Sequence, residues 1–173
     1  AEAKKKGLDV SCSVAVHNLC FTDDTLTEFD SHFKLMPPLR TQLDRKALIK
    51  GLKDGTIDFV TTDHRPMDIE HKRVEFDNAS DGTIGLESAF GMLNQIFDLD
   101  TTISLLTKGR ERYGIETPVL KVGENAALTL FDPDQEYTFE EEDILSNSKN
   151  SCFVGSKLKG KVYGIVSNNQ IIN

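Results

Sequence analysis

The first part of the chain carries apolar positions in the order expected for alternating strands and helices. A short helical start closed by Gly7 precedes residues 8–16, whose β-branched and small side chains with partial alternation predict a mostly buried strand. An apolar stripe then predicts a helix with Asp44 as its N-cap and its end at residues 54–55. A second β-branched run over residues 57–62 predicts another strand, so this part reads as α/β.

Two long irregular stretches follow these strands, over residues 22–41 and 65–85. The first contains Pro37 and Pro38, which fit neither a helix interior nor a central strand. Loops of this length in a compact fold are more often functional than idle. The second strand also ends on polar residues that include Asp63, and the carboxyl ends of parallel strands are where α/β folds usually place a site.

Two further helices are predicted, over residues 86–97 and near residues 101–113. Strand, long loop and helix, repeated, is the order of βα units with loops at the carboxyl ends of parallel strands. Two such units cannot close a sheet, and a complete eight-fold barrel needs roughly 200 to 400 residues, so this chain is expected to supply only the last quarter to third of one.

The spacing of hydrophobic residues changes after Gly123, and a small antiparallel β unit is predicted there. Strands are expected over residues 127–131 and 161–166, with a turn over residues 167–170 that leads to a final apolar pair. We therefore expect an α/β segment over residues 1–118 and a small β-domain segment over residues 119–173.

Charge and composition narrow the classes of partner. The chain has 20 basic and 28 acidic residues, a net charge of -8, which argues against a nucleic-acid-binding surface. Much of the acidic excess lies in one run, expected to be a solvated loop or edge. Its members are Asp132, Asp134, Glu136, Glu140, Glu141, Glu142 and Asp143. No stretch reaches the ~18 apolar residues of a membrane helix, and a mean hydropathy of -0.33 suits a soluble globular protein.

The three cysteines, Cys12, Cys20 and Cys152, cannot all pair, and none lies in a C-x-x-C spacing. A disulfide framework is therefore not expected, and a reducing cytoplasm suits these thiols best. The chain opens without Met and within the last turns of a helix, so a fragment of a longer chain is expected.

Several motifs occur in the order found in one enzyme family. They are Lys34-Leu35-Met36-Pro37-Pro38-Leu39-Arg40, Leu52-Lys53-Asp54-Gly55-Thr56-Ile57-Asp58, Thr62-Asp63-His64-Arg65-Pro66, Gly82-Thr83-Ile84-Gly85-Leu86-Glu87, Val16-His17-Asn18-Leu19, and Gly155 with Leu158-Lys159-Gly160-Lys161-Val162. Together they resemble the dihydroorotases of the amidohydrolase superfamily over nearly the whole chain. The resemblance implies the last βα units of a (β/α)8 TIM-type barrel and the C-terminal part of a small β-sandwich domain. It also implies that an H-x-H zinc motif, a substrate arginine and a metal-bridging lysine belong to a missing N-terminal portion.

The resemblance assigns roles at the strand ends. Family members open a cyclic amide with a metal-bound hydroxide, and Asp63 matches the aspartate that binds metal and shuttles the proton. Outside such a match, a strand-end aspartate often only caps a backbone amide. Asn18 stands where the family has a zinc-binding histidine, and Asn is a poor zinc ligand. His17 lies one place earlier, facing the opposite side of a strand, so we expect a hydrogen-bonded structural histidine.

The substrate positions implied by the resemblance also depart from the family. Met36 replaces an Asn that contacts the pyrimidine ring, Met67 replaces a His, and Ser80 replaces a Pro, whereas Gly82 and Gly85 are kept. A thioether cannot donate the lost hydrogen bonds. His32 and His71, in polar loops near carboxylates, are expected to be solvent-exposed rather than functional.

These departures favour a non-catalytic dihydroorotase homologue, which the family resemblance links to aspartate carbamoyltransferase as a structural partner, with homo-oligomer formation also expected. Zinc is the family cofactor, and none is expected for this fragment, which alone should be inactive and either unstable or self-associating. An active zinc dihydroorotase of pyrimidine biosynthesis with unusual loops is the alternative. A hydantoinase or allantoinase is weaker, because the Pro-Pro-Leu-Arg and Gly-x-x-Gly-Leu-Glu motifs look more like dihydroorotase.

Overall fold

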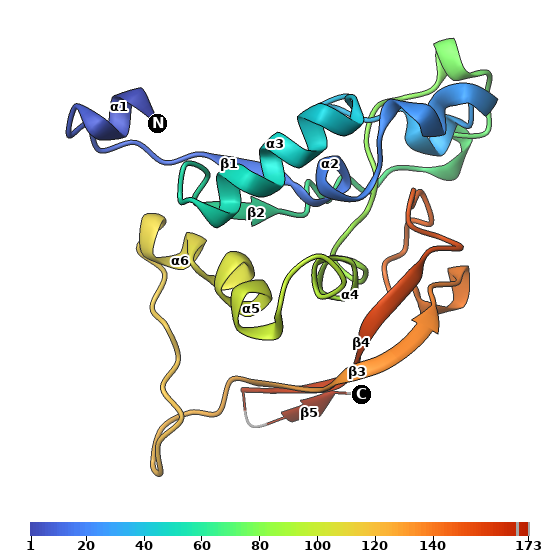
Figure 1. Cartoon of the computed structure of the whole chain (residues 1–173). Helices are drawn as coiled ribbons and strands as arrows, with labels where there is room; N and C mark the ends of the chain where they lie inside the picture. The colour runs from blue at the N-terminus through green and yellow to red at the C-terminus, as the bar shows by residue number, and fades with distance from the viewer. Residues whose placement is uncertain (169, 173) are drawn as a thin grey trace.

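The computed structural model describes residues 1–168 and 170–172, and the predicted turn over residues 167–170 lies partly outside this range. Two sheets are present (Figure 1). Helices α4 (Ala89–Leu93), α5 (Leu99–Thr107) and α6 (Gly109–Arg112) lie between the small parallel sheet above and the antiparallel sheet below.

The upper sheet pairs β1 (Ser13–Ala15) with β2 (Phe59–Thr61) in parallel. The predicted parallel strands are confirmed, but both are shorter than expected. Residues 8–13 are exposed, and helix α2 (Val16–Cys20) begins directly after β1. The strand is short because its only partner in the described chain pairs with it over three residues.

Helix α3 (Gln42–Lys53) connects the two strands and begins earlier than the sequence indicated. Thr41, not Asp44, is the N-cap: the Thr41 hydroxyl accepts from the Asp44 amide at 3.3 Å, and the Asp44 carboxylate accepts from the Thr41 amide at 3.2 Å. Asp44 is therefore the reciprocal partner of a capping box. The predicted end at Asp54 and Gly55 is confirmed, with Gly55 at a φ of 75°.

The later helices differ in length from those predicted. The expected helix over residues 86–97 is reduced to the five residues of α4, and turns carry the apolar stripe on either side. The expected helix over residues 101–113 begins earlier, because the Asp98 carboxylate caps the Thr101 amide at 2.9 Å, and it divides at Lys108 into α5 and α6. The short N-terminal helix α1 (Glu2–Lys5) is confirmed.

The two long irregular stretches are confirmed as loops whose regular structure is limited to short 3-10 helices. The first contains η1 (Asp23–Glu28) and η2 (Ser31–Phe33). The second contains η3 (Ile69–His71) and η4 (Phe76–Asn78).

The lower sheet is antiparallel in the order β3 (Leu128–Thr138), β4 (Lys157–Ser167) and β5 (Gln170–Ile172), as predicted, with longer strands. The acidic run begins in β3, an edge strand, and ends in η5 (Glu141–Asp143). Asp143 pairs with Lys161 at 2.7 Å.

One hydrophobic core joins the two sheets. Its buried members come from both parts of the chain and include Val14, Val16, Leu19, Ile84, Leu93, Phe139, Cys152, Phe153 and Leu158. Helix α4 packs on β4 closely enough that a Cβ at Gly91 would lie 2.8 Å from the Leu158 Cβ. Two hydrogen bonds seal the junction: the Ile84 amide donates to the Asn150 carbonyl, and the Cys152 amide to the Thr83 hydroxyl, both at 3.0 Å. The division at residues 118/119 stays a prediction.

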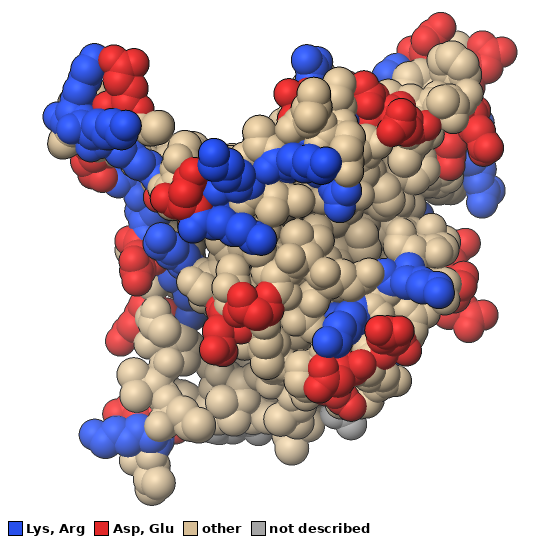
Figure 2. Space-filling view, viewed as in Figure 1, with Lys and Arg blue, Asp and Glu red and all other residues tan. Residues whose placement is uncertain are grey.

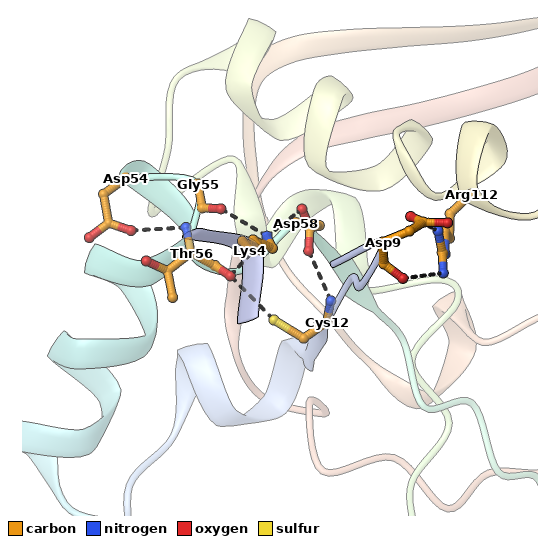
Figure 3. Close-up of polar contacts among 8 residues, drawn as sticks. All are labelled: Lys4, Asp9, Cys12, Asp54, Gly55, Thr56, Asp58 and Arg112. Atoms are coloured by element: carbon orange, nitrogen blue, oxygen red, sulfur yellow. Dashed lines mark hydrogen bonds and ion pairs between the residues drawn. The ribbon is translucent and has the colours of Figure 1, made fainter. Parts of the chain in front are cut away.

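The side chain of Lys4 connects the N-terminal helix to the amino ends of the strands (Figure 3). Lys4 Nζ donates to the carbonyls of Gly55 and Thr56 at 3.0 and 3.1 Å and pairs with Asp58 at 2.7 Å. The second Asp58 oxygen accepts from the Cys12 amide at 2.8 Å. This cluster lies at the strand ends opposite to Asp63, so it orders the chain start rather than the loops of the candidate site.

The surface and the cysteines add little to the candidate site. On the face seen in Figure 2, acidic and basic side chains are interspersed, with basic groups frequent along α3. No helix in the described ranges has the length and apolar character needed to cross a membrane. Cys12, Cys20 and Cys152 are free thiols, as expected.

Candidate functional site

The parallel register of β1 and β2 brings the predicted strand-end residues together. Ala15 lies opposite Thr61, so His17 and Asp63 each follow two residues beyond a matched pair. Asp63 is exposed and adopts a left-handed backbone with a φ of 46°, and its carboxylate accepts from the Thr61 hydroxyl at 3.2 Å. A non-glycine residue in this region is uncommon and concentrates at turns and functional sites.

The residues after β1 lie on a helix, so the expectation that His17 and Asn18 face opposite sides of a strand is wrong. Both side chains are buried, and both bind the loop that follows α2. Asn18 Nδ2 donates to the Pro38 carbonyl at 3.0 Å, and His17 Nε2 lies 3.3 Å from the Pro37 carbonyl. The hydrogen-bonded, structural environment expected for His17 is confirmed.

The charge of His17 is set mainly by its burial. Burial lowers its pKa below the ordinary value, while the hydrogen bond to Pro37 and the negative charge of Asp63 act in the opposite direction. His17 Nδ1 is buried and has no hydrogen-bond partner within the described residues. The imidazole is therefore held neutral beside the Asp63 carboxylate at physiological pH.

The loop that carries Met36 is tied to the loop that carries Ser80 and Gly82. The Met36 side chain is 60% exposed, and the Gly82 amide donates to the Lys34 carbonyl at 3.0 Å. Gly82 has a φ of 122°, and a Cβ there would lie 2.7 Å from the Arg65 Cδ. Both features require glycine at this position.

The segment that contains Met67 is held by hydrogen bonds with residues that lie between β3 and β4. The Met67 amide donates to the Ser148 hydroxyl at 3.1 Å, and that hydroxyl lies 2.5 Å from the Met67 carbonyl. Asn150, which is buried, donates to the Arg65 carbonyl at 3.0 Å. The sequence prediction missed Ser148 and Asn150, because contacts across more than 80 residues have no local signature.

The remaining histidines near the site are structural or exposed. His64 Nδ1 accepts from the amides of Gly85 and Leu86 at 3.2 and 3.4 Å, which places its proton on Nε2 in the neutral form. His71 is exposed, as expected. His32 is half-buried and lies 2.9 Å from Asp30, so the prediction of a solvent-exposed His32 is only partly correct.

The described residues do not fit a zinc site. Asp63 supplies one carboxylate, the Asn18 amide already binds Pro38, and His17 Nε2 faces Pro37. Within residues 1–168 and 170–172, no group of three or more His, Cys, Asp or Glu side chains could hold a metal ion. Structural and catalytic zinc sites use at least three such protein ligands.

Comparison with known proteins gives clear relatives, although no family model matches the chain. The dihydroorotase of Caldicellulosiruptor saccharolyticus is 39% identical over 177 residues, which cover 98% of this chain and 41% of that protein. The chain thus spans about two fifths of the length of the curated relatives it matches.

Solved structures show the same fold. The L-hydantoinase (dihydropyrimidinase) from Arthrobacter aurescens matches with a TM-score of 0.87 and 24% identity, over 99% of this chain and 41% of that one. An inactive dihydroorotase-like domain of a CAD-like multifunctional protein from Chaetomium thermophilum matches with a TM-score of 0.67 and 22% identity, over 98% and 45%. The mixed α/β arrangement is therefore the fold that these structures have over the matched part of their chains.

Proposed function

Because this chain is homologous to dihydroorotases over nearly all of its length and spans about two fifths of theirs, we propose that it forms the last βα units of an amidohydrolase (β/α)8 barrel and the C-terminal part of its β-sandwich domain. The proposed division lies between residues 118 and 119. In support, two parallel strands with long loops at their carboxyl ends precede an antiparallel three-stranded sheet.

The protein that contains this chain is, in our proposal, a non-catalytic dihydroorotase homologue. The observation that carries this is the side chain at position 18, where an amide bound to the Pro38 carbonyl replaces an imidazole. Asp63, which we assign to the family metal and general-base position, belongs to no group of three or more possible metal ligands among the described residues. Losing a ligand removes metal affinity and transition-state contacts together.

The substrate positions support the same proposal. We assign Met36, Met67, Ser80 and Gly82 to the loops that face the substrate in the family. The thioethers of Met36 and Met67 donate no hydrogen bond, so a polar ring would lose two partners. Only Gly82 retains the backbone freedom that its loop requires.

A structural role beside aspartate carbamoyltransferase is the function we propose in place of catalysis. The neighbour titled an inactive dihydroorotase-like domain of a CAD-like multifunctional protein supports the idea that this fold persists without activity. We further propose a homo-oligomer in the cytoplasm, where three free thiols are stable.

Assay of the full-length protein that contains this chain for hydrolysis of dihydroorotate and cyclisation of carbamoyl aspartate, with added zinc, tests the catalytic part. An active dihydroorotase in the same assay is the control. We expect no measurable turnover and no stoichiometric zinc after dialysis, and robust metal-dependent turnover would establish the alternative, an active zinc dihydroorotase.

Co-purification with the aspartate carbamoyltransferase of the same organism tests the structural part. We expect a complex that stabilises or activates the transcarbamoylase. Inactivity together with no association would remove the scaffold role.

A further inference from the structure

Lys72 is a fully buried lysine in the loop after β2, with 1% of its surface exposed. Lysine is almost never fully buried unless it is paired. Within the described ranges, however, no carboxylate lies within ion-pair distance of Lys72 Nζ. Its partners are backbone carbonyl groups.

Those carbonyl groups belong to the loop after α2. Lys72 Nζ donates to the Ser31 carbonyl at 2.9 Å and to the Lys34 carbonyl at 3.0 Å, and the Ser31 hydroxyl donates back to the Lys72 carbonyl. Both the side chain and the backbone of Lys72 therefore hold residues 31–34. Hydrogen bonds from an ammonium group are stronger than those between neutral groups.

The Lys34 carbonyl also binds the segment that contains Ser80 and Gly82. The Lys34 carbonyl accepts from the Gly82 amide as well as from Lys72 Nζ, and the Ser80 amide donates to the His71 carbonyl at 3.0 Å. Lys72 thus lies where the segment that precedes Met36 meets the segment of Ser80 and Gly82.

We propose that Lys72 is the positioning residue that locks these two loops together, so that the face containing Asp63 keeps one fixed loop arrangement without a bound ligand. The proposal holds whether or not the protein is catalytic. Burial lowers the pKa of Lys72 to about 8, against the opposing charges of Asp30 and Asp81, so the ammonium form still predominates at neutral pH.

Hydrogen–deuterium exchange on the full chain tests the proposal with Lys72→Met, which keeps the apolar stem and removes the donors. We expect exchange to accelerate about ten- to a hundredfold at the Gly82 amide and over residues 31–36, the effect of losing charge-assisted hydrogen bonds. The amides of α3 should be unchanged. Lys72→Gln, which keeps two N–H donors without the charge, should restore part of the protection.

Lys4→Met is the matched control, because Lys4 also donates to two carbonyls but at the opposite strand ends. It should accelerate exchange near residues 55–58 and leave Gly82 unchanged. Unchanged protection at Gly82 in folded Lys72→Met, or uniform acceleration that includes α3, would overturn the positioning role. If Lys72→Met does not fold, the same two criteria apply to Lys72→Gln.

Discussion

The side-chain amide of Asn18 donates a 3.0 Å hydrogen bond to the carbonyl oxygen of Pro38. This contact fixes the loop of Met36 against α2, and it occupies the side-chain amide that we propose stands at the family's imidazole position. In that proposal, the residue holds a loop instead of coordinating a metal ion beside Asp63.

Asn18→Ala is expected to lower the free energy of unfolding by about 1 to 2 kcal/mol, because it leaves a carbonyl without its partner in a buried site. Denaturant unfolding of the full chain measures the change. Asn78→Ala, at an exposed amide, is the control and should change stability by less than about 0.5 kcal/mol. Equal effects of the two substitutions would contradict the role of Asn18.

His17 should make the protein less stable as the pH falls below its ordinary pKa of 6.5. Its pKa is lowered in the fold, so unfolding takes up a proton, and the stability present above pH 6.5 is lost as pH falls towards the folded pKa. His17→Gln should flatten this part of the profile in unfolding measured between about pH 7 and 5. A profile with the same slope in folded His17→Gln as in the unsubstituted protein would disprove the assignment.

Lys72 should give a dependence of the same sign, at alkaline pH. Its pKa is about 8 in the fold against 10.5 for an ordinary lysine, so between these values only the unfolded chain keeps the proton. Stability relative to Lys72→Met should rise with pH across this window, by at most about 3 kcal/mol. The buried thiols of Cys20 and Cys152 have raised pKa values and act in the other direction, but they are common to both proteins. If the difference in unfolding free energy between the unsubstituted protein and Lys72→Met does not change with pH, this linkage is refuted.

Gly160 should be far less tolerant of alanine than Gly155. Both have positive φ, 104° and 81° respectively. A Cβ at Gly160 would lie 2.6 Å from the Phe90 ring, whereas a Cβ at Gly155 would have no described neighbour within 4 Å. We expect losses of about 2 to 4 kcal/mol for Gly160→Ala and about 1 to 2 kcal/mol for Gly155→Ala by thermal or urea unfolding. Equal losses would show that α4 can move away from β4.

Local pattern was enough to predict the order of strands and helices and the placement of Asp63 at a strand end. The β-branched run before Asp63 predicts β2 because its composition and its neighbours agree. Helix α2 was missed, because five residues that begin with Val16 have neither a side-chain cap nor a full amphipathic period.

Residues whose role depends on distant partners could not be predicted. Lys72 reads as a surface residue until its contacts with residues 31 and 34 are known. Asn150 gives no signal in its own segment, since its partners are Arg65 and Thr83. Burial of a polar side chain is a property of the folded chain and not of its neighbours in sequence.

The pairing of Thr83 and Ile84 with residues 150–152 also affects how the chain is made. On the ribosome, Leu93 emerges about 60 residues before Phe153, which at ordinary rates of synthesis is about 3 to 12 seconds, and Val16 and Leu19 emerge earlier still. During that interval the core lacks Phe153, and Thr83 and Ile84 lack their hydrogen-bond partners in residues 150–152. The nascent chain therefore exposes apolar surface until residues 150–153 have emerged, and this interval is when chaperone binding or aggregation would decide its yield.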